Sequence, residues 1–196
     1  MRHSTVLAAS LIAVALSLPA HAATIVYSAS MTGAAESPPV ASPGTGTVVV
    51  TFDTVGLTMQ VNANFANLVG TTTVAHIHCC TAVAGLNNAG VATYPGTFPG
   101  WPVGVQSGSY NQVFDMSLTS SYAAGFLSAN GATALGAFNG LLAGLDAGKG
   151  YFNIHSTFAP GGEIRGFLLR VPEPGSLALL GLGLAALGLS RRRKAA

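Results

Sequence analysis

Residues 45–65 read TGTVVVTFDTVGLTMQVNANF, and this stretch decides the fold class of the protein. Residues 45–52 are rich in β-branched side chains, which are typical of strands. From Leu57 to Phe65 every second residue is apolar, and a period of two indicates a strand with one buried face. The segment 53–56 lies between them as a short turn that contains glycine, so the stretch predicts a β-hairpin.

The same signals recur further along the chain. Four more segments have the length, alternation or composition of strands: 73–78, 113–118, 151–156 and 163–170. The last two bracket a Pro-Gly turn at 159–162, which predicts a second hairpin. Only residues 120–145 have a helical pattern, and their glycines weaken it. Short strands separated by such turns predict an all-β fold, either an antiparallel β-sandwich or a barrel-like domain.

The N-terminal residues have the order of a secretory signal peptide. Arg2 precedes an apolar run at 6–18, and residues 20–22 (AHA) form a small-residue cleavage pattern. The run is shorter than the about 20 apolar residues that a membrane-spanning helix needs. We therefore expect residues 1–22 to be removed on export, so that the mature protein starts at Ala23. The alternative is a short N-terminal anchor.

Three signals follow one another in the C-terminal residues 171–196: the tripeptide Pro172-Glu173-Pro174, an apolar stretch at 177–189, and the cations Arg191, Arg192, Arg193 and Lys194. Cations beside an apolar segment favour the cytoplasmic side of a membrane, so the preceding domain is expected outside. The apolar stretch is short and rich in glycine, which makes it a marginal spanning helix. We expect a transient membrane segment and a processing signal rather than a permanent anchor.

The domain between the two ends, residues 23–170, is long enough to bury one hydrophobic core. It contains three cations and five anions, so its net charge is −2. The basic isoelectric point of the whole chain, about 8.7, therefore comes from the two ends. Nucleic-acid binding is excluded on electrostatic grounds, because it needs a basic patch that this domain lacks.

The C-terminal tail resembles the PEP-CTERM family of sorting signals, which combine a Pro-Glu-Pro motif, an apolar helix and an arginine cluster in this order. The resemblance implies that an exosortase-type protease cuts near the motif. It also implies that the protein is passed to the cell surface or the extracellular matrix, with only transient membrane residence through residues 177–189.

The domain itself resembles the CHRD-domain family. Three segments match the signatures of that family in order: MTGAAESPPV at 31–40, AHIH at 75–78, and YFNIHS at 151–156 followed by PGGEIRG at 160–166. The resemblance implies an extracellular β-rich module with a binding or structural role and no settled catalytic activity. Cys79 and Cys80 depart from the pattern, because many relatives have a Gly-rich turn there.

The three histidines of the domain lie in these matching segments. His76 and His78 are two apart in a predicted strand, so both side chains are expected on one face. His155 lies in another predicted strand, and we expect all three imidazoles to form one cluster. Because imidazole suits copper and zinc, the three histidines are a candidate metal site for either ion. The alternative is a set of hydrogen-bonded histidines that order the sheet.

Cys79 and Cys80 are the only cysteines of the chain, and they are adjacent. An exported protein can form disulfides. Neighbouring Cα atoms lie about 3.8 Å apart across a trans peptide, less than the usual disulfide span of about 4.4–6.8 Å. A bridge between them is therefore expected to be strained and redox-labile. A metal-linked role and an intermolecular bridge are the alternatives.

Two further features have a structural and a functional interpretation. Glu163 and Arg165 are two apart in a predicted strand, and we interpret them as a structural ion pair that ties down the closing hairpin. The loop 94–102 (YPGTFPGWP) is rich in aromatic residues and proline and cannot be a regular strand. Its aromatic rings either contact a sugar or protein ligand or fold over the core.

These observations support two classes of function. The first is an exported surface or matrix protein with a noncatalytic CHRD-type module that binds an extracellular polysaccharide or protein. The second is a copper or zinc β-sandwich protein with redox or hydrolytic activity. Metal analysis of the exported protein distinguishes the two classes.

Overall fold

The computed structural model describes residues 24–172 and 181–184. The expected signal peptide, most of the apolar stretch at 177–189 and the terminal cations therefore lie outside the described residues. Residues 181–184 are helical. Within the two described ranges, no helix combines the length and the apolar character that crossing a membrane requires.

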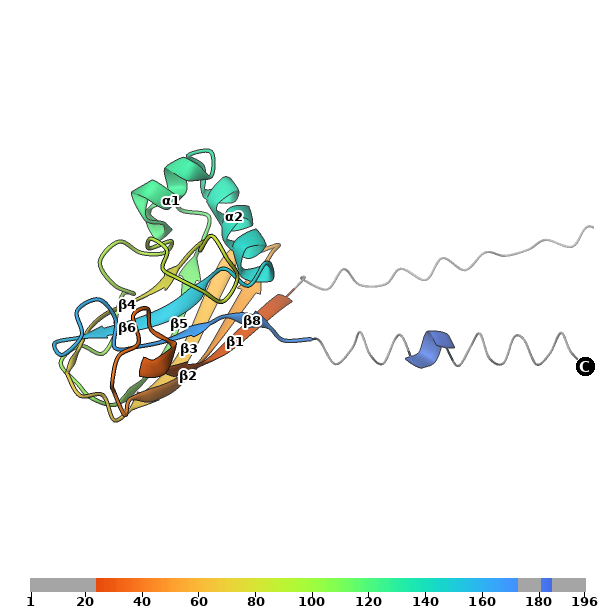
Figure 1. Cartoon of the computed structure of the whole chain (residues 1–196). Coiled ribbons are helices and arrows are strands. Elements are labelled where there is room, and N and C mark those ends of the chain that lie inside the picture. The colour runs from red at the N-terminus through yellow and green to blue at the C-terminus, as the bar shows by residue number, and fades with distance from the viewer. Residues whose placement is uncertain (1–23, 173–180, 185–196) are drawn as a thin grey trace, which may run out of the picture.

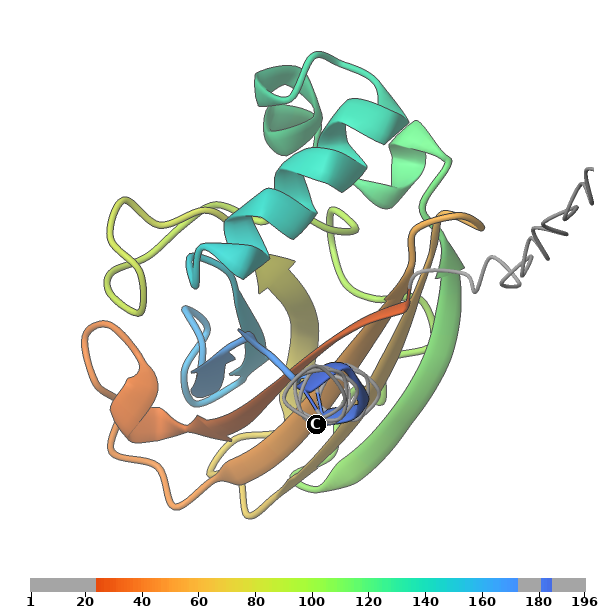
Figure 2. The ribbon, with the colours of Figure 1, turned by 90° about the vertical axis from the view of Figure 1, so that its right-hand side faces the viewer.

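Within residues 24–172, eight strands form one antiparallel sheet: β1 (Thr24–Thr32), β2 (Thr45–Asp53), β3 (Thr58–Ala66), β4 (Thr72–His78), β5 (Gly108–Asp115), β6 (Tyr151–Ser156), β7 (Ile164–Phe167) and β8 (Leu169–Arg170). Their order is β4-β6-β7-β1-β2-β3-β5, and β8 pairs with β1. The sheet curls into a half-barrel, as Figures 1 and 2 show. The all-β prediction is thus confirmed, and the barrel-like alternative describes the sheet better than a sandwich.

The two predicted hairpins lie on opposite sides of β1 in this sheet. β2 and β3 pair with Val50 opposite Val61 and Phe52 opposite Met59, and all four side chains are buried. β6 and β7 form the second hairpin, closed by the turn at 159–162. The alternation that predicted the first hairpin is therefore the pattern by which its strands fill the core.

Two α-helices cover one side of the curved sheet (Figure 2): α1 (Ala124–Ala129) and α2 (Ala134–Asp146). Thr133 caps α2, because its hydroxyl accepts a backbone N–H of the first turn. Phe138 of α2 meets Phe52 of β2 edge-on, with ring centroids 5.8 Å apart. The described chain also has two short 3-10 helices: η1 (Gly33–Ala35) and η2 (Thr119–Ser121).

Two strands differ from their predicted bounds. The strand expected at 113–118 is β5, which ends at Asp115 because that side chain accepts the N–H of Ser117 and turns the chain. The strand expected at 163–170 is divided into β7 and β8. Leu168 lies between them with its side chain buried. β7 pairs with both β6 and β1, whereas β8 pairs with β1.

β1 was not among the predicted strands, although it lies in the middle of the sheet. Its buried residues are Tyr27 and Met31, while Ala29 between them is only partly buried. Small side chains and side chains with a hydroxyl group therefore interrupt the alternation of apolar and polar residues from which a strand is predicted. β1 joins the two predicted hairpins, since it pairs with β2 on one side and with β7 and β8 on the other.

Candidate metal centre

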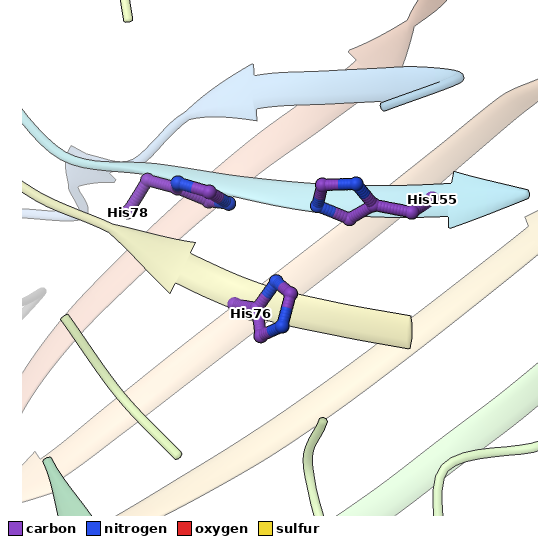
Figure 3. A group of neighbouring side chains, drawn as sticks. All are labelled: His76, His78 and His155. Carbon is purple, nitrogen blue, oxygen red and sulfur yellow. The ribbon is translucent and has the colours of Figure 1, made fainter. Parts of the chain in front are cut away.

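The three histidines lie on two neighbouring strands, β4 and β6. His76 and His78 follow the strand period and lie on the face opposite to buried Ile77. His76 is the cross-strand partner of Asn153, so His155, two residues further along β6, comes beside it on the same face. Figure 3 shows the three rings gathered over this strand pair. The predicted cluster is confirmed.

The rings are close enough to share one ion. The ring centroids are 5.4 Å apart for His76 and His78, 5.1 Å for His76 and His155, and 5.7 Å for His78 and His155. One ring nitrogen of each histidine lies within 4.8 Å of those of the other two. Metal–nitrogen bonds of about 2.0–2.1 Å in a tetrahedral site place ligand nitrogens about 3.4 Å apart. A small inward movement of the rings therefore completes the geometry.

Each ring has one nitrogen fixed by a backbone carbonyl: His76 Nε2 to Gly96 O (3.0 Å), His78 Nδ1 to Ala89 O (2.9 Å) and His155 Nδ1 to Pro160 O (2.8 Å). A carbonyl oxygen only accepts, so these nitrogens carry the hydrogen. The other nitrogens are buried and have no hydrogen-bond partner among the described residues: Nδ1 of His76, Nε2 of His78 and Nε2 of His155. Three lone pairs thus converge, and a cation fits them.

Burial keeps the three imidazoles neutral. It lowers the pKa of His78 to about 4, opposed by the hydrogen bond to Ala89 and aided by the nearby histidines. Burial likewise lowers the pKa of His76 and the pKa of His155. Neutral imidazole is the form that binds a metal, so all three candidate ligands are in the metal-binding form at pH 7.

Tyr151 holds His78 in place. The two rings stack at 4.9 Å with an interplanar angle of 2°. The Tyr151 hydroxyl accepts the N–H of Ala89 at 3.2 Å and donates to its oxygen at 3.3 Å, the same oxygen that fixes His78. On the other side, the guanidinium of Arg165 lies 4.6 Å from the centre of the Tyr151 ring. The position of His78 is therefore set by a buried network.

A second group of buried polar side chains adjoins the histidines. Oδ1 of Asn153 and Oε1 of Glu36 are buried and lack a hydrogen-bond partner among the described residues. Both side chains approach Gly162, where an added Cβ would overlap the Asn153 amide and lie 2.8 Å from Glu36 Oε1. Burial raises the pKa of Glu36 to about 7, and Arg165 opposes the rise. This carboxyl group therefore keeps a proton close to neutral pH.

The expected ion pair between Glu163 and Arg165 is wrong. Among the described residues, Arg165 pairs with Glu36, with Nε and Oε2 3.7 Å apart. Glu163 instead accepts hydrogen bonds from the Ser42 hydroxyl and the Val69 N–H, each at 2.6 Å. The reason is that β7 begins at Ile164, so Glu163 precedes the strand and does not follow its alternation.

Glu163 fastens a loop to the closing hairpin. Besides Ser42 and Val69, the Gly70 N–H and the Ser156 hydroxyl donate to it. Burial would raise the pKa of Glu163, but these hydrogen bonds outweigh it and hold the pKa below its ordinary value. The residue is structural, as expected, with partners that the sequence pattern did not indicate.

Cys79 and Cys80 form a disulfide with each other across a cis peptide bond. Cys79 is buried and Cys80 is exposed. An added Cβ at Gly144 of α2 would overlap both sulfur atoms, so the bridge packs against this helix. The histidine side chains lie on the other face of β4, and the structure does not bring the cysteines into their cluster.

The aromatic loop at 94–102 folds over the core. Phe98 is fully buried and Trp101 is 5% exposed. Trp101 stacks on Phe65 of β3 with ring centroids 5.4 Å apart. Of the two interpretations of this loop, packing over the core is the one that the structure shows for these two rings.

Sequence patterns did not single out Asn153, Tyr151 or Glu36 as parts of the site. For Asn153 and Tyr151 a signal existed, because both alternate with His155 along one strand and so share its face. Glu36 belongs to a turn after η1, and no periodicity connects it with the histidines.

Comparison with known families gives two matches. The CHRD domain matches residues 27–168, and the PEP-CTERM protein-sorting motif matches residues 170–194. No curated protein and no solved structure matches the chain.

Proposed function

The chain belongs to the CHRD-domain family, and from this premise we propose that it is an exported, surface-sorted protein whose CHRD domain binds one copper ion. Its PEP-CTERM motif indicates export to the cell envelope or surface and processing by an exosortase, a membrane protease. The proposed ligands are His76, His78 and His155.

One observation carries the proposal. Three buried imidazole nitrogens without hydrogen point at one another, and each ring is fixed by a carbonyl bond on its other side. An unsatisfied buried polar group costs about 1–3 kcal/mol, so three together are costly unless something binds them. A protein that used these histidines only to order the sheet would be expected to pair them with donors.

We propose copper because it is expected to outcompete the other divalent metals for a site made of imidazole nitrogens. Neutral imidazoles suit both copper and zinc, but copper(II) binds a given nitrogen site most tightly among the divalent first-row metals. Three protein ligands leave one position open for water or a similarly small ligand. The rings are at most 8% exposed, which favours holding an ion over processing a polymeric substrate. We therefore assign the domain a binding role.

The test is metal content. The purified exported protein is stripped with a chelator, offered copper(II) and zinc(II) at equal concentration, dialysed, and assayed by elemental analysis. We expect one copper per chain. Retention of neither metal would contradict the proposal and leave the histidines with a structural role, while retention of zinc alone would correct the identity of the ion.

The first variant to measure is His78→Ala. It removes one ligand, so copper affinity is expected to fall at least about 100-fold, more than the loss of an outer partner costs. The control is Asn62→Ala, an exposed position on β3, which should leave affinity unchanged. Residues 23–170 contain no other histidine, so the nitrogen hyperfine structure in the copper(II) EPR spectrum should indicate three imidazoles and change in His78→Ala.

A second candidate function, contact with a neutral polysaccharide, is supported by the outer faces of β2, β3 and β5. Their exposed outer-face side chains between the strand ends carry no charge: Thr47, Val49, Asn62, Asn64, Ser109, Asn111 and Val113. The register places Asn62 opposite Asn111, so amides from neighbouring strands lie together. Amides and hydroxyls match the hydroxyl groups of an uncharged sugar chain.

Cosedimentation with insoluble neutral polysaccharides tests this surface. The double variant Asn62→Asp and Asn111→Asp places two like charges side by side and should abolish binding. Binding that is unaffected by the two charges would exclude these strands as the contact face.

A further inference from the structure

The Cys79–Cys80 disulfide joins neighbouring residues, so it links no part of the fold to another. A disulfide stabilises a protein mainly by closing a loop of the unfolded chain, and the effect grows with the length of the loop. Here the loop has its smallest length. The ordinary stabilising role of a disulfide therefore does not account for this bridge.

The bridge is open to reagents from solution. A cavity of about 560 Å³ borders it, lined by both cysteines and by residues of the 90–91 segment and α1. Cys80 is exposed, while Cys79 is 6% exposed. On the α1 side, Phe126 lines the cavity beside the small residues Gly125 and Ala129, and because Cys80 is exposed, an attacking group can approach its sulfur.

The bridge also adjoins the candidate metal centre through the segment 89–91. The N–H of Cys79 donates to Gly90 O at 3.1 Å. The preceding carbonyl, Ala89 O, accepts from Nδ1 of His78 at 2.9 Å. One short segment thus contacts the disulfide on one side and fixes a proposed metal ligand on the other.

We propose that Cys79–Cys80 is a redox-active disulfide that exchanges with dithiols, and that its reduction weakens the copper site through residues 89–91 and His78. The exchange stands by itself, and the effect on copper rests on the proposed function.

The exchange is a two-electron reduction in two steps. A thiolate of the dithiol attacks Sγ of Cys80, the Cys79–Cys80 bond breaks, and Sγ of Cys79 leaves with the electron pair and takes a proton. The second thiolate of the dithiol then attacks its own first sulfur and releases Cys80, which also takes a proton. The protein gains two electrons and two protons, and the dithiol becomes an internal disulfide.

Reduction changes the space that the sulfurs need. Two unbonded thiols keep a van der Waals distance and occupy more room than a bonded pair. No additional room is available on the α2 side, because both sulfurs already lie against the backbone of Gly144. The added volume must therefore be taken up towards the 89–91 segment or by a shift of α2, and the first of these moves the carbonyl that orients His78.

Native reduction tests the exchange. The folded, metal-free exported protein is incubated with dithiothreitol, alkylated, and measured by mass spectrometry, while circular dichroism monitors the fold. We expect two alkylated cysteines in a protein that is still folded. Alkylation that occurs only after the protein is denatured would overturn the proposal.

A matched pair of variants tests the route. Ala129→Phe places a ring at the mouth of the cavity and should slow reduction at least about fivefold. Ala124→Phe places the same ring on the exposed side of α1, outside the residues that line the cavity, and should leave the rate unchanged. Equal rates in both variants would show that the cavity is not the path of the dithiol.

The effect on copper is measured without a reductant, because dithiols bind copper themselves. The double variant Cys79→Ser and Cys80→Ser imitates the open bridge, and its copper affinity should be at least about tenfold weaker, in the range of lost outer partners. Unchanged affinity would overturn the coupling while leaving the exchange intact. If neither protein binds copper, the proposed function fails, and the alkylation result still decides the exchange.

Discussion

In each of the three histidines, the ring nitrogen that carries the hydrogen determines which nitrogen is left free to bind a metal. Backbone carbonyls at Gly96, Ala89 and Pro160 decide this for the three histidines. The sequence could predict that the rings cluster, because strands place alternate residues on one face. It could not predict the carbonyl partners, because these come from irregular loops whose positions depend on tertiary packing.

The lowered histidine pKa values predict acid sensitivity of the metal-free protein. Because the folded-state pKa of His78 is about 4 and the ordinary value is 6.5, the unfolded chain takes up the proton first. This contribution to stability is present above about pH 6.5 and is lost as the pH falls towards 4. Urea titrations at pH 7.0, 5.5 and 4.5 should therefore show a falling free energy of unfolding.

Glu36 changes the free energy of unfolding with pH in the direction opposite to the histidines, and it serves as the control. Its folded-state pKa of about 7 lies above the ordinary 4.5, so its contribution to stability is present below pH 4.5 and is lost as the pH rises through 7. Glu36→Gln removes this slope, and the loss of stability in acid should become steeper. A wild-type protein that gains stability between pH 6.5 and 4.5, with no change in slope in the variant, would contradict both assignments.

At the scale of elements, two glycines of the helices predict opposite effects of one substitution. In α2, Gly144→Ala places a methyl group on the sulfurs of the Cys79–Cys80 bridge, and such overpacking costs about 1–3 kcal/mol. In α1, Gly125→Ala meets open space and should stabilise by up to about 1 kcal/mol through helix propensity. Chemical denaturation measures both, and a shift of the same sign in both variants would refute the packing argument.

The elements also show where sequence patterns succeed. β2 was predictable because it is rich in β-branched residues, and β3 because apolar and polar residues alternate along it. β1 was not predicted, because Ala29 and its neighbouring serines interrupt the alternation of apolar and polar residues in its sequence. The strand is nevertheless paired with neighbouring strands on both sides. Glu163 was assigned the wrong partner because the start of β7 at Ile164 cannot be read to one residue from the sequence.

For the whole molecule, both ends of the described domain leave on the same side (Figure 1). β1 and β8 are antiparallel, with Tyr27 opposite Arg170, so the first strand begins close to where the last strand ends. The sorting motif matches residues 170–194, so it begins at the last residue of β8. A protease that acts near Pro172 therefore cuts beside the domain and not within it.

This position predicts what is found on the cell surface. We expect the surface form to begin at Ala23 and to lack Arg191 to Lys194, because a signal peptide and a sorting tail are the two segments that we predict to be removed. Intact-mass spectrometry of the surface protein checks this, with the motif variant Glu173→Ala as the comparison that should keep its tail. A surface form that still contains Arg191 would show that the tail is a permanent anchor.

The place of β1 in the sheet also sets an order of events during secretion. β1 is the first strand to emerge, and β2 follows it along the chain, but its other partners, β7 and β8, emerge last. One edge of β1 stays unpaired until then, and an open edge invites pairing with other chains. Cleavage after folding thus releases a domain in which both edges of β1 are paired, whereas earlier cleavage would set free a chain that is prone to aggregate.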